Sequence, residues 1–509
     1  MQVIRKTFGL STIKEAHSMQ LERKKGWGIL SALLLAVGFG LIFYICNTPI
    51  GPCIGSDNAM YLTMGTALSE GYAPYREIFD HKGPLLFLSQ MIPQSIAGPY
   101  NMTAVFVQQA AVLFLCLVIL AGIARELSVS PLAAQLLYLA LISSVTSGGN
   151  LTEEYASLPT LLVIWAALRV FGKRELPEPK KLFGPSLLVG VCAMAAFLFR
   201  ANNALPIAAL VLVLAVFLAV KKNWAALGFC AGGFTLGLVL CLLPVALWLA
   251  AHGALWDAFY GSILHNFLYT ETSGASRVQT LLKTAYGRTA ILMAALSCMG
   301  AAAVYRLRGS RMLACGMVAA AAAGGLAGFL SHKFYLHYLV VGAPMAAFGG
   351  AALLALFKKP EAKKRAALVT MAACVLVLAV QGVKINGIRL DALDGLDEFT
   401  QNAQHLMAQV PEDERDTFMA YRVEPKWYVA AGALPCQRFY FLQEILADAD
   451  PAVMDEIVED FETDPPHYLV LYYNRPFSPP YDERVQKIFE TEYERMDTAG
   501  QYQLLRLKQ

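Results

Sequence analysis

The chain has 509 residues, of which 57% are hydrophobic and only 16% are charged. Soluble globular domains carry about 25% charged residues, so this composition excludes one large soluble enzyme. The formal net charge of +3 conceals a division. Residues 1–389 contain 31 Lys and Arg against 14 Asp and Glu (+17), whereas residues 390–509 contain 10 against 24 (−14). The two parts are therefore adapted to different surroundings.

Eleven apolar runs with few charges are long enough to cross a membrane, whose hydrocarbon core needs about 20 helical residues. A twelfth run, Leu85–Ala97, is shorter and contains Pro93, so we expect a re-entrant or interfacial helix there. The stretch before Trp27 shows no cleavage site, so the first span is expected to stay as an anchor. The predicted spans are 27–46, 101–124, 131–147, 155–171, 182–199, 203–220, 224–250, 289–305, 312–330, 334–357 and 366–383.

The basic residues predict the orientation of these spans. With the N-terminus inside and residues 85–97 not crossing, inner segments hold 22 of the 31 basic residues up to Arg389 and outer segments hold 9. Short cytoplasmic loops are enriched in Lys and Arg, and a crossing by 85–97 would invert the bias. We therefore expect a multi-pass protein of the cell membrane. It would have a cytoplasmic segment 1–26, a membrane part 27–389 and an extracytoplasmic domain 390–509.

The first outer loop, residues 47–84, is predicted to be a built structure. Ser56 is a plausible N-cap, and Ala59–Leu68 has the spacing of a short amphipathic helix that Gly71 would end. Two cysteines fall on the outer side, Cys53 and Cys436. Either a disulfide between them or two unpaired thiols fits the sequence.

The motifs of this loop resemble a known family. Ser56–Tyr61 reads SDNAMY, and Pro74–Phe87 reads PYREIFDHKGPLLF. Both are similar to the first-loop signature of GT-C membrane glycosyltransferases that use lipid-linked sugars, in the branch of the protein mannosyltransferases and aminoarabinose transferases. Asn150–Tyr155 (NLTEEY) and Lys333–Tyr338 (KFYLHY) fit the same group. The resemblance spans essentially the whole chain.

The resemblance implies an inverting transfer of a sugar at the outer face. The donor would be a polyprenyl-phosphate sugar, and the acceptor an envelope glycan, lipid or protein. Asp57 matches the family's first-loop catalytic aspartate, a base for the acceptor's proton. Asp80 is a second catalytic candidate, because it could orient Lys82 or act as another acid. Lys82, Arg200 and Lys333 lie at outer membrane ends, where they are candidates to bind the donor phosphate.

Further polar and aromatic residues near these positions are candidate substrate contacts: Tyr61, His81, Glu153, Glu154, Asn202, Tyr335, His337 and Tyr338. Relatives that use a divalent metal carry ligands at the second outer turn, so Glu153 or Glu154 with Asp57 would hold one. The first loop lacks a clear DxD, which leaves the metal open. Simpler roles also fit the residues: Asp57 as a helix cap, Lys82 as a snorkelling side chain, and the Tyr335–Tyr338 aromatics as an interfacial belt.

In residues 390–509, predicted helices alternate with predicted strands, which is typical of a small α/β domain. Strands are predicted at 417–421, 467–473 and 501–507, and helices at 427–431, 442–447, 453–462 and 482–496. No nucleotide-binding glycine loop or metal-ligand spacing is evident there. The domain would serve as a cap over the site or in acceptor recognition.

The expected fold is thus a polytopic α-helical membrane protein of about eleven spans, GT-C-like, with a structured first outer loop and a small extracytoplasmic α/β domain. The alternative function is a transporter or flippase of lipid-linked sugars. A transporter carries ionisable residues inside its spans and often inverted repeats. Here the span interiors are almost free of charge, which favours the glycosyltransferase. Nothing in the sequence indicates a nucleic-acid partner; membrane lipid is the expected surrounding.

Overall fold

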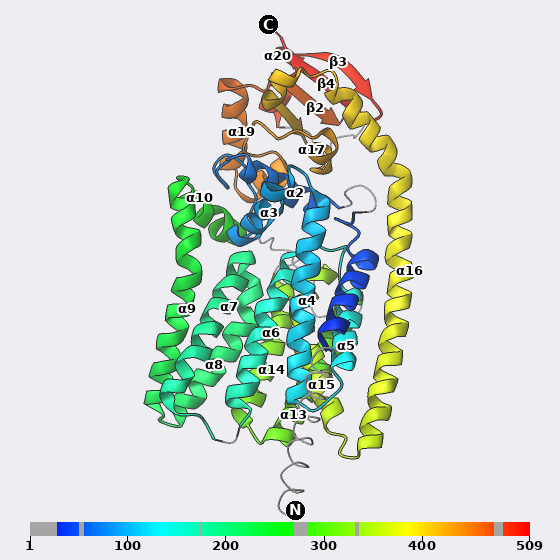
Figure 1. Cartoon of the computed structure of the whole chain (residues 1–509). Helices are drawn as coiled ribbons and strands as arrows, with labels where there is room; N and C mark the ends of the chain where they lie inside the picture. The colour runs from blue at the N-terminus through cyan, green and yellow to red at the C-terminus, as the bar shows by residue number, and fades with distance from the viewer. Residues whose placement is uncertain are drawn as a thin grey trace, which may run out of the picture.

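The computed structural model describes residues 28–49, 55–173, 175–268, 284–330, 335–472 and 482–508. Cys53, a candidate for a disulfide, and Lys333, a candidate to bind the donor phosphate, lie outside this described part. A bundle of long helices forms one end and the middle of the molecule, and a small domain with a sheet forms the other end (Figure 1).

Among the described residues, eight helical segments are long and apolar enough to cross a membrane. Three shorter apolar helices, Gly28–Phe43, Pro131–Ser143 and Arg311–Leu326, coincide with the other predicted spans. In chain order the helices are Gly28–Phe43, α2 (Ser56–Ser69), α3 (Pro84–Ala97), α4 (Met102–Glu126), α5 (Pro131–Ser143), α6 (Thr152–Phe171), η1 (Pro179–Leu182), α7 (Phe183–Phe199), η2 (Ala201–Ala204), α8 (Leu205–Val220), α9 (Trp224–Ala251), α10 (Leu255–Phe259), the π-helix η3 (Tyr260–Leu264), α11 (His265–Leu268), α13 (Ala285–Arg308), α14 (Arg311–Leu330), η4 (Leu336–Gly342), α15 (Ala343–Ala355) and α16 (Pro360–Met407).

Small residues let these helices pack closely. A Cβ on Gly300 of α13 would lie 2.1 Å from the Cα of Gly349 on α15, so the two helices touch backbone to backbone. Helices in apolar surroundings gain from such approach, because van der Waals contact drives their association there. One apolar core cluster runs through this bundle from the first helix to α16.

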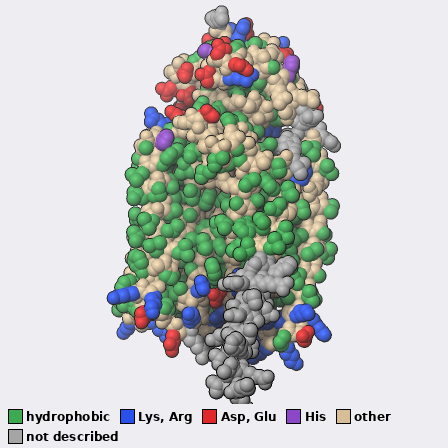
Figure 2. Space-filling view, in the orientation of Figure 1, with side chains coloured by type: hydrophobic (Ala, Val, Ile, Leu, Met, Phe, Trp, Pro, Cys, Tyr) green, Lys and Arg blue, Asp and Glu red, His purple; other side chains and the backbone are tan. Residues whose placement is uncertain are grey.

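The charges gather at the two ends of the molecule. Figure 2 shows hydrophobic side chains covering the middle, Lys and Arg at the lower end, and Asp and Glu over the C-terminal domain. The turn between α8 and α9 lies at the lower end (Figure 1), and its residues Lys221 and Lys222 are exposed. The basic turns and the acidic domain therefore lie on opposite sides of the apolar band.

The first loop folds onto the upper end of the bundle. There α2 and α3 lie together above the long helices, and α3 is the predicted short helix (Figure 1). Two details of the prediction are wrong. Gly55 occupies the N-cap position of α2 in place of Ser56, and α2 is buried all round, from Asn58 to Leu68. It is not amphipathic because α3 and the C-terminal domain cover different parts of it.

The C-terminal domain has one four-stranded sheet in the order β1-β2-β4-β3. β1 pairs parallel with β2, and the other two pairs are antiparallel. Its elements are η5 (Glu412–Thr417), β1 (Phe418–Tyr421), α17 (Lys426–Ala431), α18 (Gln443–Ala449), α19 (Ala452–Thr463), β2 (Tyr468–Tyr472), α20 (Glu483–Glu492), β3 (Tyr493–Ala499) and β4 (Tyr502–Leu507).

The predicted helix 482–496 is wrong beyond residue 492, where β3 begins. Val485 and Phe489 are buried on α20, and Tyr493 continues their spacing of four residues into the strand. A tight turn at Gly500, with φ of +56°, then joins β3 to β4. The hairpin therefore overrides a helical pattern that the spacing alone could not distinguish.

The two parts of the molecule share structure. α16 continues through the predicted boundary between residues 389 and 390 without a break. A single apolar cluster includes Met60 and Phe79 of the first loop, Leu249 of α9, and Tyr440 and Leu469 of the C-terminal domain. The domain is thus packed onto the first loop, which positions the residues of the candidate site.

Candidate functional site

The turn before α3 carries a buried ion pair. Lys82 Nζ lies 3.4 Å from Asp80 Oδ1, and the Lys82 backbone N–H donates to the same oxygen at 2.9 Å. Burial by itself lowers the pKa of Lys82, but the carboxylates of Asp80 and Asp57 raise it, and the net pKa lies above the ordinary value. Lys82 is therefore a cation at neutral pH. Asp80, in the same loop, both holds its position and helps to keep it protonated.

A second ion pair joins two membrane helices. Arg200, at the end of α7, donates from Nη1 to Glu153 Oε1 at 2.9 Å, and Glu153 lies in the first turn of α6. Nη2 donates to the Tyr338 hydroxyl at 3.2 Å, and the guanidinium lies 4.5 Å from the centre of that ring. Glu153 is 97% buried and Arg200 about four-fifths buried, so the pair is largely desolvated.

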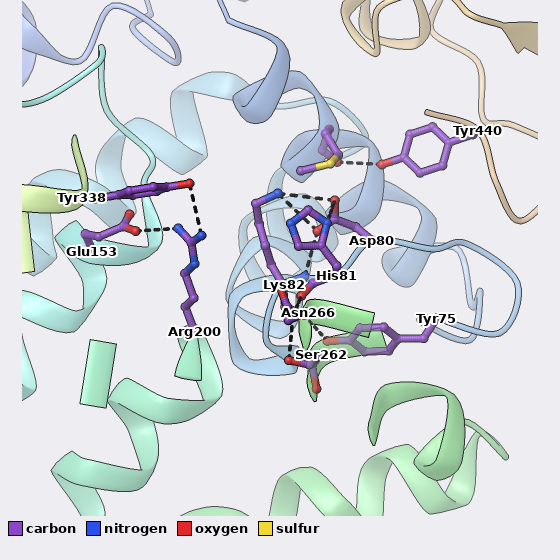
Figure 3. Close-up of polar contacts among 11 residues, drawn as sticks. Tyr75, Asp80, His81, Lys82, Glu153, Arg200, Ser262, Asn266, Tyr338 and Tyr440 are labelled. Carbon is purple, nitrogen blue, oxygen red and sulfur yellow. Dashed lines mark hydrogen bonds and ion pairs between the residues drawn. The ribbon is translucent and has the colours of Figure 1, made fainter. Parts of the chain in front are cut away.

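A glycine contact brings the two pairs together. The Gly83 N–H donates to the Phe199 carbonyl at 3.2 Å, and these residues adjoin Lys82 and Arg200 in the chain. A Cβ on Gly83 would lie 2.0 Å from the Leu198 carbonyl oxygen, so glycine is required for this approach. Figure 3 shows the Lys82 side chain on the side of its loop that faces the Arg200 pair.

Asp57 and Tyr61 complete this cluster. Asp57 is exposed in the first turn of α2. Tyr61 is buried one turn later, and its ring centre lies 5.5 Å from Lys82 Nζ. Burial, and then the charges of Asp57, Asp80 and Glu153, raise the pKa of Tyr61. Three of the predicted carboxylates and two of the predicted cations therefore act on one tyrosine: Asp57, Asp80, Glu153, Lys82 and Arg200.

His81 belongs to the wall of this cluster. Burial, and then the positive charges of Lys82 and Arg200, lower the pKa of His81 well below its ordinary value. The ring is thus neutral at pH 7, and its 3.8 Å approach to Asp80 is not an ion pair. Its carbonyl accepts a hydrogen bond from Asn266 Nδ2 of α11 at 2.8 Å. This contact ties the turn to the segment after α10.

Aromatic residues of the predicted Lys333–Tyr338 motif lie beside Arg200. Tyr335 is half exposed and stacks on His337, with ring centres 5.5 Å apart, and Tyr338 lies edge-on to both. His337 Nδ1 lies 3.3 Å from the Ser147 hydroxyl. Asn202 is half-buried in η2, two residues beyond Arg200. Tyr338 thus contacts Arg200 directly, and Tyr335 and His337 lie against Tyr338, whereas Lys333 lies outside the described residues.

Glu154 points elsewhere. Its carboxylate accepts hydrogen bonds from Gln109 Nε2 of α4 at 2.9 Å and from the Thr146 hydroxyl at 2.7 Å. Glu153 is engaged by Arg200, and among the described residues no group of three His, Cys, Asp or Glu could hold a metal ion. The predicted pairing of Glu153 or Glu154 with Asp57 therefore does not fit a divalent metal.

A buried amide network that the sequence did not predict supports Asp57. Asn150, with φ of +59° and no exposed surface, donates to Asn58 Oδ1 at 2.7 Å and to Gln90 Oε1 at 3.0 Å. The Tyr155 hydroxyl donates to Asn150 Oδ1 at 2.7 Å. This network joins α2, α3 and α6. The sequence signal for this network is that Asn58, Gln90 and Asn150 stand next to apolar runs. Amide side chains buried among apolar residues need hydrogen-bond partners, so they are expected to bind one another.

An apolar cavity is lined by the residues that follow the two cations in the chain. It has a volume of about 140 Å³, and its lining includes Gly83 and Ala201, which adjoin Lys82 and Arg200. Most of the remaining wall consists of apolar side chains from α7, α9, α10 and the π-helix η3, among them Leu198, Val245 and Phe259. An amphiphile with an anionic head would find both kinds of surface here.

No protein-family model matches the chain, and no curated protein matches it. Its structure is similar to the crystal structure of ArnT from Cupriavidus metallidurans bound to undecaprenyl phosphate. The TM-score is 0.58 at 14% sequence identity, with 94% of this chain and 98% of ArnT covered. The apo state of ArnT gives a TM-score of 0.57 at 13% identity, with 94% and 97% covered. The chain has the GT-C fold.

An Archaeoglobus fulgidus oligosaccharyltransferase in complex with Zn and sulfate is also similar, with a TM-score of 0.48 at 12% identity and 86% and 67% covered. The likeness to ArnT confirms the fold expected from the first-loop motifs. The protein is a polytopic helical membrane protein with a small C-terminal domain.

Proposed function

We propose that this GT-C protein is a membrane glycosyltransferase that takes a sugar from a polyprenyl-phosphate donor. The observation that carries the proposal is the apolar cavity whose lining includes Gly83 and Ala201, the residues that directly follow Lys82 and Arg200 in the chain. A polyprenyl chain is apolar and its phosphate anionic, so the two surfaces match the two parts of the donor. Undecaprenyl phosphate, which is bound in the ArnT crystal structure, has this chemistry.

Asp57 is the general base in this proposal. It removes the proton of an acceptor hydroxyl as that oxygen attacks the anomeric carbon from the side opposite the phosphate. The bond between the anomeric carbon and the phosphate oxygen breaks, its electron pair stays on the phosphate, and the anomeric configuration inverts. Lys82 and Arg200 stabilise the charge that develops on the leaving phosphate. Asp80 orients Lys82, as their contacts support.

The proposed reaction takes place at the end of the molecule that carries the C-terminal domain. The concentration of basic residues at the opposite end supports an extracytoplasmic location for this face, because short basic loops stay in the cytoplasm. The acceptor class that fits is an envelope glycan, lipid or protein that offers a hydroxyl group. Tyr335 is the exposed aromatic ring beside Arg200, where a sugar ring could stack.

The test is a panel of polyprenyl-phosphate sugars incubated with the purified protein in detergent, with released polyprenyl phosphate as the readout. Asp57→Asn should lower kcat by about 10²- to 10⁴-fold and leave binding of undecaprenyl phosphate within about twofold. Glu70→Gln is the matched control, because Glu70 is an exposed carboxylate at the other end of α2. Wild-type turnover by Asp57→Asn would contradict the assignment of the base.

Arg200→Ala should weaken the binding of undecaprenyl phosphate by about tenfold or more, since a charge-assisted hydrogen bond contributes about 1.5–3 kcal/mol. Arg76→Met, which removes an exposed cation from the first loop, is the control and should bind as wild type does. Unchanged binding by Arg200→Ala would show that Arg200 is only structural. Movement of intact donor across vesicle membranes without sugar transfer would support a flippase instead.

A further inference from the structure

The C-terminal domain holds the turn of the first loop through one arginine. Arg438, between α17 and α18, donates from Nε to the Tyr75 carbonyl at 2.8 Å. Its own carbonyl accepts a hydrogen bond from the Phe79 N–H at 3.0 Å, and its guanidinium lies 5.3 Å from the centre of the Phe79 ring. Arg438 therefore binds both ends of the turn that leads into Asp80.

The other side of the same guanidinium is anchored in the domain. Arg438 Nη1 lies 2.7 Å and 3.0 Å from the two carboxylate oxygens of Glu456 on α19. Nη2 lies 3.8 Å from Asp257 on α10. The Arg438 side chain is 17% exposed, so these contacts are largely shielded from water. One side chain thus joins the domain, the first loop and α10.

Tyr75 carries this contact on to the candidate site. It is fully buried with φ of +66°, a conformation that a bulky residue adopts only when its surroundings hold it there. Its hydroxyl donates to the Lys82 carbonyl at 2.6 Å, as Figure 3 shows. The same tyrosine therefore receives Arg438 at its backbone and supports Lys82 with its side chain.

We infer that Arg438 and Tyr75 are positioning residues through which the C-terminal domain aims Lys82 at the donor phosphate. The inference rests on the proposed function and gives the domain a role that neither its fold nor its sequence assigns. The contacts form a continuous path from Glu456 through Arg438 and Tyr75 to Lys82, and each step is a hydrogen bond of 3.0 Å or less. The domain acts on the donor without touching it.

The test is a set of double-mutant cycles with undecaprenyl phosphate binding in detergent as the readout. Arg438→Met and Tyr75→Phe are each combined with Lys82→Met. Each single substitution should weaken binding by about three- to tenfold, the effect of a hydrogen bond lost from a coupled set. In the Lys82→Met background, either substitution should change binding by less than about 1.5-fold, because its effect passes through Lys82.

Asp455→Asn is the matched control. Asp455 neighbours Glu456 on α19, but its side chain is exposed and pairs with the exposed Arg484. The Asp455→Asn variant should bind undecaprenyl phosphate as the wild type does. Glu456→Gln should weaken binding, but less than Arg438→Met does. Because Tyr75→Phe removes one oxygen atom only, it remains informative if Arg438→Met fails to fold, and melting temperatures identify that case.

The outcomes separate the two proposals. If Lys82→Met binds undecaprenyl phosphate as wild type does, the proposed function of Lys82 fails. If Lys82→Met is impaired but Arg438→Met and Tyr75→Phe weaken binding equally in both backgrounds, or have no effect in either, the positioning role is overturned. Coupling to Lys82 supports it, because a general loss of stability would not depend on the residue at position 82.

Discussion

The two ion pairs beside the apolar cavity are built in different ways. Asp80 and Lys82 are two residues apart in one loop, and the backbone N–H of Lys82 also binds the Asp80 carboxylate. Glu153 and Arg200 are 47 residues apart, on two membrane helices. The first pair is a product of local chain geometry, whereas the second exists only when α6 and α7 have packed.

The chemistry of the two cations differs as well. A buried lysine can lose its proton, but an arginine stays charged at any pH that a protein meets. The cluster therefore combines a cation whose charge depends on its neighbours with one that is permanent. Gly83 joins the two regions, since its N–H binds the residue before Arg200. Variants that act on one pair at a time separate the contributions of the two pairs.

The largest effect is expected from Gly83→Ala, which removes the contact between the regions. The added Cβ would lie 2.0 Å from the Leu198 carbonyl oxygen, so the loop must shift away from α7. A misplacement of about 1 Å costs about 100-fold in rate, and a loss of transfer of that size or greater is expected. Gly184→Ala on α7, where a Cβ meets no atom within 4 Å, is the control. Full activity of Gly83→Ala would show that this contact does not align the cations.

The second prediction compares the stability of the pairs. Glu153→Gln leaves the permanent charge of Arg200 without its counter-ion in a largely buried site and should destabilise the protein by about 3 kcal/mol. Asp80→Asn should cost less, because Lys82 can deprotonate and the new amide oxygen still accepts the Lys82 N–H. Melting temperatures in detergent give the order. A lower melting temperature for Asp80→Asn than for Glu153→Gln would reverse the comparison.

The third prediction concerns pH. In the wild type, burial lowers the pKa of Lys82, but Asp80 and then Asp57 raise it, and the net pKa lies above the ordinary lysine value. Lys82 therefore stays protonated through the neutral range and loses its charge only at strongly alkaline pH. Asp80→Asn removes the larger raising contribution, so its binding of undecaprenyl phosphate should decline at a lower pH than in the wild type. The double variant Asp80→Asn/Lys82→Arg should lose this shift, since arginine does not titrate there.

The smallest effect is expected from removal of metal ions. The carboxylate of Glu153 is engaged by Arg200, and that of Glu154 by Gln109 and Thr146. Transfer measured with EDTA should therefore stay within about twofold of the rate without it, as the two protein cations face the proposed phosphate site. Loss of transfer with EDTA and recovery with one divalent cation would show that a metal joins these pairs.

The sequence predicted the spans well because membrane crossing depends on local composition. Each apolar run of sufficient length became a helix, and the short run with Pro93 became α3 at the upper end of the bundle. In the C-terminal domain, three strands and most helices followed from alternation and turn residues. β3 was missed because Val485, Phe489 and Tyr493 keep one spacing across the boundary between helix and strand.

The candidate site was only partly predictable. Asp57, Asp80 and Lys82 stand within one loop motif, so their proximity could be inferred from the chain itself. The role of Gly83 and of the amide of Asn150 depends on which surfaces pack against them, and a sequence pattern does not contain that information. The same holds for Glu154, which the sequence could not distinguish from Glu153.

The sequence by itself determined that most of the chain lies in a membrane, which end carries the basic turns, and which loop carries charged residues beside it. These properties follow from hydrophobicity and charge, which act residue by residue. Only the tertiary structure decided that Arg200 pairs with Glu153, that Gly83 brings Lys82 to Arg200, and that Arg438 reaches Tyr75 from the C-terminal domain. Those contacts join distant segments, and their geometry is set by how helices and domain pack together.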